Sequence, residues 1–193
     1  MSRFTFLLII SIFLAACSSN DKQSANLPIV IETKSQVVQI DQVISNAQIE
    51  VQSSLPNAYL TFFSFVGQCS DLPKLQGDVR LDFARIQQSL FGDRTILARA
   101  EIDTVSQTLS FNTKDETEHY PKLEPLVING KGIQEIATIL HDYLVSKNAC
   151  TDVVVLTRVR TETPWRVRCG PPEQVLLECM EIDPETGEVV ERK

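Results

Sequence analysis

Apolar residues recur along this chain with two different periods, one typical of helices and one typical of strands. Spacing of about 3.6 residues predicts amphipathic helices over residues 40–55, 79–91 and 133–148. Dense or alternating apolar runs predict strands over residues 27–32, 59–66, 95–102, 105–111, 152–161, 164–169, 175–182 and 187–192. Together they predict an α+β fold, in which an antiparallel sheet carries about three helices and the C-terminal helix is followed by a β-meander.

The first apolar run is too short to be a membrane-spanning helix. It holds eleven residues, Phe4 to Leu14, whereas a spanning helix needs roughly 20. Arg3 gives the run a positive start, and Ala15 and Ala16 supply the small residues that signal peptidase requires. Residues 1–16 are therefore expected to be a signal peptide.

The stretch Leu14-Ala15-Ala16-Cys17 resembles the lipobox of bacterial lipoproteins. This resemblance covers residues 1–17 and implies cleavage before Cys17, lipidation of its sulfur and acylation of its new amine. Several acyl chains would give stable membrane anchoring, because each buried methylene contributes about 0.8 kcal/mol. In this family Ser18 after the cysteine implies the outer membrane, facing the periplasm, with the inner membrane and the cell surface as alternatives.

The remainder is expected to be a tethered, acidic domain. The polar residues 18–26 predict a flexible tether after Cys17, and residues 27–193 an α+β domain. Loss of Arg3 with the leader changes the formal net charge from −7 to −8. An acidic chain lacks the basic field that nucleic acids require, so nucleic acid is excluded as a partner. The expected contacts are the membrane, through Cys17, and an envelope protein.

Four cysteines remain for the domain: Cys69, Cys150, Cys169 and Cys179. Their even number in an oxidising compartment predicts two disulfides. No pair has the spacing of a zinc knuckle, so no metal or other cofactor is expected. A tight hairpin after Cys169 would leave Cys179 about 13 Å away along the strands, beyond the roughly 7 Å that a disulfide allows. We therefore expect Cys150–Cys169 and Cys69–Cys179, and a local Cys169–Cys179 bridge only if a bulge intervenes.

A cluster of arginines is the candidate binding site. If residues 161–164 turn a hairpin, alternation places four guanidinium groups on the outer face of the sheet: Arg158, Arg160, Arg166 and Arg168. Such a group could hold an anionic ligand, either a carboxylate-bearing polymer or a phosphate. The alternative is a solvated sheet face that is neutralised by acidic neighbours, among them Glu162 and Glu178.

The last third of the chain resembles a PepSY-type module over residues 131–192. The resemblance lies in a helix followed by a meander, in Trp165 to Arg168, and in the Asp-x-x-Thr-Gly-x-Val turn that begins at Asp183. It implies a small α+β module of envelope proteins that is often linked to the modulation of proteases.

These observations predict a non-enzymatic, membrane-anchored envelope lipoprotein that acts as a binding, assembly or accessory factor. The alternative is a small envelope hydrolase, or a thiol peptidase that uses Cys69 with His119 or His141. No Gly-x-Ser-x-Gly motif and no phosphate-binding loop occurs in the chain.

Overall fold

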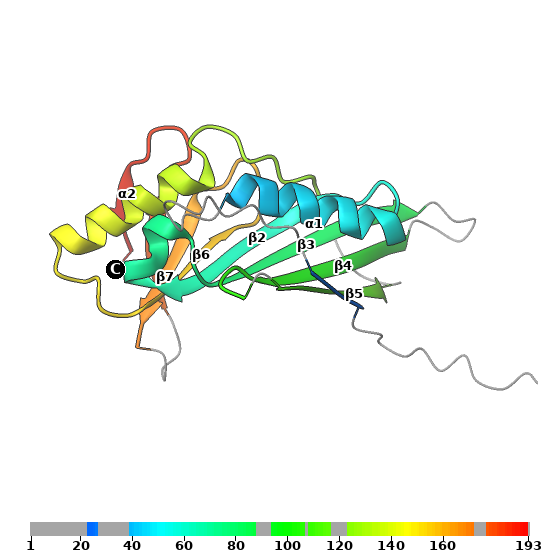
Figure 1. Cartoon of the computed structure of the whole chain (residues 1–193). Helices are drawn as coiled ribbons and strands as arrows, with labels where there is room; N and C mark the ends of the chain where they lie inside the picture. Colours follow the sequence, from blue (N-terminus) through cyan, green and yellow to red (C-terminus); the bar gives the residue numbers. More distant parts are fainter. Residues whose placement is uncertain are drawn as a thin grey trace, which may run out of the picture.

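The structure, a computed structural model, describes residues 23–26, 39–87, 94–106, 108–116, 123–171 and 177–192. The expected signal peptide, Cys17, the strand at 27–32 and His119 lie outside these residues. Within them the α+β class and the antiparallel sheet are confirmed. Figure 1 shows the helices gathered over one face of a long sheet.

Two α-helices, one 3-10 helix and nine strands make up the described part of the chain. The helices are α1 (Ile40–Ser54), η1 (Cys69–Lys74) and α2 (Ile133–Ser146). The strands are β1 (Gln23–Asn26), β2 (Tyr59–Gln68), β3 (Asp78–Gln87), β4 (Arg94–Asp103), β5 (Thr108–Glu116), β6 (Val153–Arg158), β7 (Trp165–Gly170), β8 (Leu177–Ile182) and β9 (Val189–Glu191).

The sheet consists of two similar units joined at its centre. Its strand order is β1-β5-β4-β3-β2-β6-β7-β8-β9, and every neighbouring pair is antiparallel. In each unit a helix precedes a four-stranded meander, α1 before β2 to β5 and α2 before β6 to β9. The first strands of the two meanders pair with each other, from Phe63 opposite Arg158 to Gln68 opposite Val153. The units therefore share one sheet in a two-fold-like topology that the sequence does not reveal as a repeat.

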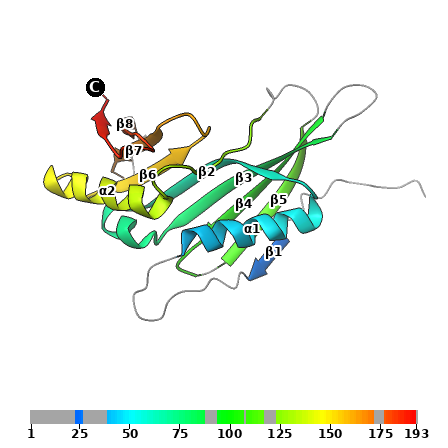
Figure 2. The same cartoon turned by 90° about the horizontal axis from the view of Figure 1, so that it is seen from above.

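One continuous core lies between the sheet and the helices. On the sheet side it is lined by Phe63, Phe65, Leu81 and Phe83, all with no exposed surface. On the helix side α1 supplies Val43, Ala47 and Val51 and α2 supplies Ile136 and Leu140, at the spacing that their sequence predicts. Figure 2, seen from above, shows α1 and α2 lying end to end over the sheet. We call the sheet surface away from these helices the outer face.

The predicted helix after Asp78 is wrong, because this segment is strand β3. Val79, Leu81 and Phe83 alternate inward and pair with Ile102, Ala100 and Ala98 of β4. The helical pattern depended on Val79, Phe83, Ile86 and Leu90, and two of these four also fit a period of two. Long-range pairing on both sides of β3 decides between the two periods, and a single segment cannot show it. The described residues therefore hold two α-helices instead of the three expected.

Two further boundaries differ from the expectation. Residues 23–26 of the expected tether form β1, which pairs with β5 from Gln23 opposite Phe111 to Asn26 opposite Thr108. The strand predicted over residues 105–111 extends further than expected, because β5 continues to Glu116. The other predicted strands agree with β2, β4 and β6 to β9 to within a few residues.

Candidate functional site

The four candidate arginines do not share one face. Arg158 follows Val154 and Leu156 in alternation along β6, so it points inward and has no exposed surface. Arg166 and Arg168 of β7 lie on the outer face, opposite Thr157 and Val155 of β6. Placing Arg158 on the outer face was therefore wrong. Its charge could be buried only because the fold supplies partners for it inside.

Arg158 is held by the segments around it. Its Nη2 donates to Asn129 Oδ1 at 3.0 Å and to the carbonyl of Thr161 at 2.6 Å, and its guanidinium carbon lies 5.2 Å from the Trp165 ring centre. Within the described part of the chain, Nε and Nη1 of Arg158 and Nε1 of Trp165 have no hydrogen-bond partner. Burial lowers the pKa of Arg158, the negative charge of Glu185 opposes this shift, and an arginine so placed stays charged at neutral pH. Arg158 is thus a structural cation that ties the β6–β7 turn to the segment before α2.

Arg160 and Arg166 are the two members of the cluster that line a common pocket. The pocket has a volume of about 330 Å³ and is lined by Val159, Arg160, Thr163, Pro164 and Arg166; we call it the arginine pocket. Its wall is shaped by the β6–β7 turn, in which Thr163 donates from its amide (3.2 Å) and its hydroxyl (3.0 Å) to the carbonyl of Arg160. Arg168 does not line it.

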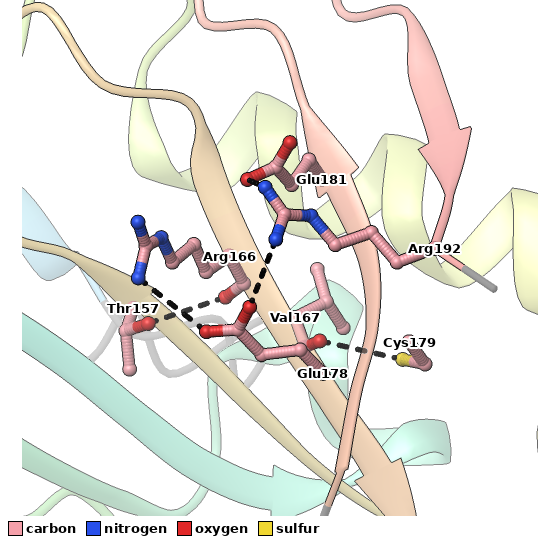
Figure 3. A network of polar contacts seen from close by, with 7 residues as sticks. All are labelled: Thr157, Arg166, Val167, Glu178, Cys179, Glu181 and Arg192. Carbon is pink, nitrogen blue, oxygen red and sulfur yellow. Dashed lines mark hydrogen bonds and ion pairs between the residues drawn. The ribbon is translucent and has the colours of Figure 1, made fainter.

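The charges around the arginine pocket are unevenly paired. Arg166 Nη1 lies 3.4 Å from Glu178 Oε1, and the other oxygen of Glu178 lies 3.4 Å from Arg192, which also contacts Glu181 (Figure 3). Arg160 makes no ion pair with any described residue. The neighbouring Val159 is 44% exposed. The alternative of a sheet face neutralised by acidic neighbours therefore holds for strands β7 to β9, where Glu178 pairs with Arg166. It does not describe Arg160.

Chemically, the arginine pocket suits an anionic group that carries a small apolar body. Two guanidinium groups can each present paired N–H donors to a carboxylate or phosphate. Val159 and Pro164 add an apolar wall, and the Thr163 hydroxyl lies beside them. The sequence pointed to the two arginines by alternation, but it gave no signal for the wall, because that depends on the path of the turn between β6 and β7.

The structure contains two disulfides, as the even cysteine count predicts, but with a different connectivity from the one expected. Cys69 bonds Cys150 (Cα–Cα 5.3 Å) and Cys169 bonds Cys179 (Cα–Cα 6.0 Å). The expected pairs Cys150–Cys169 and Cys69–Cys179 are wrong.

A shifted strand register explains the local bridge. Cys169 pairs opposite Leu177 of β8 instead of residue 175, and β8 has a bulge opposite the step from Val167 to Arg168 of β7. Cys179 is the unpaired residue of that bulge, and its Sγ lies 3.4 Å from the carbonyl of Val167 (Figure 3). The bulge that could reopen the local bridge is therefore present. The other bridge joins the start of η1 to the turn before β6, so it spans the two units of the fold.

Two residues of the thiol-peptidase alternative, Cys69 and His141, lie within the described part of the chain. Cys69 is 2% exposed and oxidised, so it holds no thiolate while its bridge to Cys150 is intact. His141 lies on α2, where its Nδ1 is 3.2 Å from Asp142 Oδ1.

Across the ranges that the structure describes, no group of three or more His, Cys, Asp or Glu is arranged to hold a metal ion. Nor does any helix in those ranges have the length and apolar character to cross a bilayer.

Comparison with known proteins assigns the chain to no group. No protein family, no curated protein and no solved structure matches it.

Proposed function

We propose that this protein is a membrane-anchored envelope lipoprotein that works by binding, as an accessory or assembly factor for an envelope protein. The observation that carries the binding role is the arginine pocket, in which Arg160 has no ionic partner among the described residues and faces the same space as Arg166. The group it recognises is an anionic side chain or terminus of the partner, with the carboxylate docked between the guanidinium groups.

Two features support the location. Disulfides persist outside the cytosol, and both bridges here join residues within the folded domain. The lipobox-like Leu14 to Cys17 supports lipidation at Cys17 and removal of residues 1–16. Lipidation would place the domain on a membrane, facing the periplasm from the outer membrane. The helix-and-meander unit from α2 to β9 supports the resemblance to a PepSY-type module, which implies an envelope protease as the partner class.

Lipidation is tested by mass spectrometry of the mature protein and by membrane fractionation. We expect Cys17 to be the first residue and to carry acyl chains, and we expect Cys17→Ser to leave the membrane fraction. An unmodified Cys17 with the leader retained would contradict the proposal.

The binding role is tested by a photo-crosslinking amino acid placed at Thr163, inside the arginine pocket, in living cells. We expect one discrete crosslinked partner, which Arg160→Glu abolishes. Arg168→Glu is the matched control, because it reverses a nearby exposed arginine outside the pocket and should preserve the crosslink. Equal crosslinking by all three proteins would refute the pocket as the binding site.

The hydrolase alternative, including a thiol peptidase using Cys69 with His119 or His141, is favoured by no contact in the described structure. A peptidase of this kind would require Cys69 in its reduced form.

A further inference from the structure

Strand β1 fixes how far the folded domain can stand from Cys17. β1 covers Gln23–Asn26 and pairs with Thr108 to Phe111 of β5, at one edge of the sheet. Gln23 is only six residues after Cys17 in the sequence. At about 3.6 Å per residue, that segment reaches about 22 Å when fully extended.

Without the pairing of β1, the tether would be far longer. The next described element is α1, which begins at Ile40. The chain from Cys17 to Ile40 could extend about 80 Å, enough to let the domain turn in any direction. The pairing of β1 with β5 therefore sets the maximum length of the segment that joins Cys17 to the folded domain. We call this segment, residues 17–23, the strap.

The strap joins the sheet at one edge, so the strand order sets how far the other parts of the domain lie from that edge. β5 and β9 lie at opposite sides of the sheet, with seven strand spacings between them. At about 4.8 Å each, the two strands are about 34 Å apart. The arginine pocket belongs to the turn between β6 and β7, four to five spacings from β5 and thus about 19–24 Å from it.

We propose that the edge formed by β1 and β5 is the membrane-facing edge of this domain, with a lipid bilayer as its partner. The sheet stands edge-on above the bilayer, and the unit from α2 to β9, which carries the arginine pocket, projects away from it. This inference rests on the proposed lipidation of Cys17. It adds that the strand next to the lipid sets which half of the molecule is presented to an envelope partner.

The outer face favours an edge-on stance over one that lies flat. On it Arg80 and Arg99 both contact Asp82, at 2.7 and 2.9 Å, and Arg166 and Arg192 contact Glu178. A sheet lying flat would press these paired charges against the bilayer surface and leave the arginine pocket little access to a protein.

The test measures the distance of two positions from the bilayer in the full-length lipidated protein in vesicles. Ser110→Cys on β5 and Val190→Cys on β9 are labelled separately with a donor dye, without reductant so that both disulfides stay intact. Energy transfer to acceptor-labelled lipids should be at least about twofold stronger from position 110. Equal transfer from both positions would overturn the edge-on stance.

A strap-breaking variant checks that β1 causes the difference. Ser24→Pro with Ala25→Pro removes two consecutive amide donors, one of which must point toward β5. We expect the transfer ratio between the two labels to fall toward one and hydrogen exchange of the β5 amides at 108–111 to rise. Ser24→Thr with Ala25→Val is the matched control and should behave as the parent. Exchange along the β2–β6 pairing should stay unchanged in all variants.

The two proposals fail differently. An unmodified Cys17 in the mass spectrum overturns both of them. A lipidated Cys17 with equal transfer from positions 110 and 190, or a proline variant with parental transfer and parental exchange, overturns only the membrane-facing edge.

Discussion

The guanidinium carbon of Arg158 lies 5.2 Å from the centre of the Trp165 ring, and neither side chain has exposed surface. The two residues come from adjacent strands, β6 and β7, at the end of the sheet that carries the β6–β7 turn. A cation is therefore built into the core, held by one aromatic face and by oxygens of Asn129 and Thr161.

Loss of the Arg158 side chain should destabilise the domain strongly. Arg158→Ala leaves a cavity and strips the partner from Asn129, so we expect a loss of about 3 kcal/mol in the free energy of unfolding. Arg158→Met fills the volume without a buried charge and should cost only about 1 kcal/mol. Urea denaturation measures both. Arg168→Met, on the outer face, should change stability by less than about 0.5 kcal/mol, and a loss there as large as that of Arg158→Ala would argue against this explanation.

The two disulfides should contribute unequally to stability. The Cys69–Cys150 bridge closes a sequence separation of 81 residues and the Cys169–Cys179 bridge one of 10. Chain-entropy arguments give about 4.5 kcal/mol for the first and about 2.7 kcal/mol for the second. Denaturation of the two double-alanine variants tests the order, and non-reducing peptide mapping tests the connectivity. A mapped Cys150–Cys169 peptide would refute the connectivity.

Acid should weaken the turns after β4 and β8. Hydrogen bonds from the hydroxyl and amide of Ser106 lower the pKa of Asp103, and those from the amide and hydroxyl of Thr186 lower the pKa of Asp183. Because each folded-state pKa lies below the unfolded value of about 3.9, the stabilisation is complete above that pH. It is lost as the pH falls through the folded-state pKa.

Thermal denaturation between about pH 7 and pH 2 checks this. The parent should lose more stability over the acidic limb than Asp103→Asn or Asp183→Asn, because asparagine keeps an acceptor but does not titrate. Carboxyl chemical shifts, followed by NMR, should show both aspartates titrating below their usual range. Identical acid limbs in all three proteins would contradict the prediction.

Gly187 should accept a side chain only with a loss of stability. Its φ is 75°, and a Cβ placed there would lie 2.7 Å from Ile139 Cδ1 on α2. We expect Gly187→Ala to destabilise the domain by about 1–2 kcal/mol, because left-handed strain and a clash with the end of the Ile139 side chain add together. Gly132→Ala is the matched control, since nothing lies within 4 Å of its Cβ position and its φ is −63°. Equal melting temperatures for the two variants would contradict this prediction, because they would mean that the turn rearranges to accommodate the methyl group.

Local patterns predicted most elements because they coincide with burial. Val43, Ala47 and Val51 repeat at helical spacing and form the buried side of α1, and the aromatic run at Tyr59 is the central strand β2. Prediction failed where distant partners decide. In β3, Val79 and Phe83 fit both periods, and the pairing of β3 with β2 and β4 selects the strand.

Only part of the candidate site was predicted, again because contacts between distant residues decide the rest. Alternation correctly assigned Arg166 to the outer face, but the phase chosen for β6 was wrong, because Arg158 shares the buried face with Val154 and Leu156. The buried partners that make an inward arginine tolerable come from Asn129 and Trp165, and the sequence does not reveal this contact. The disulfide connectivity was wrong because it assumed a tight hairpin, whereas Cys169 pairs opposite Leu177.

The bridge between Cys69 and Cys150 has a consequence for proteolysis. The connection from β5 to α2, which includes residues 123–132, lies between these two cysteines in the chain. A single cut there separates the units in sequence, yet the fragments remain covalently attached and keep their central strands hydrogen-bonded. A nicked molecule should therefore migrate as one species on a non-reducing gel and divide into two only after reduction.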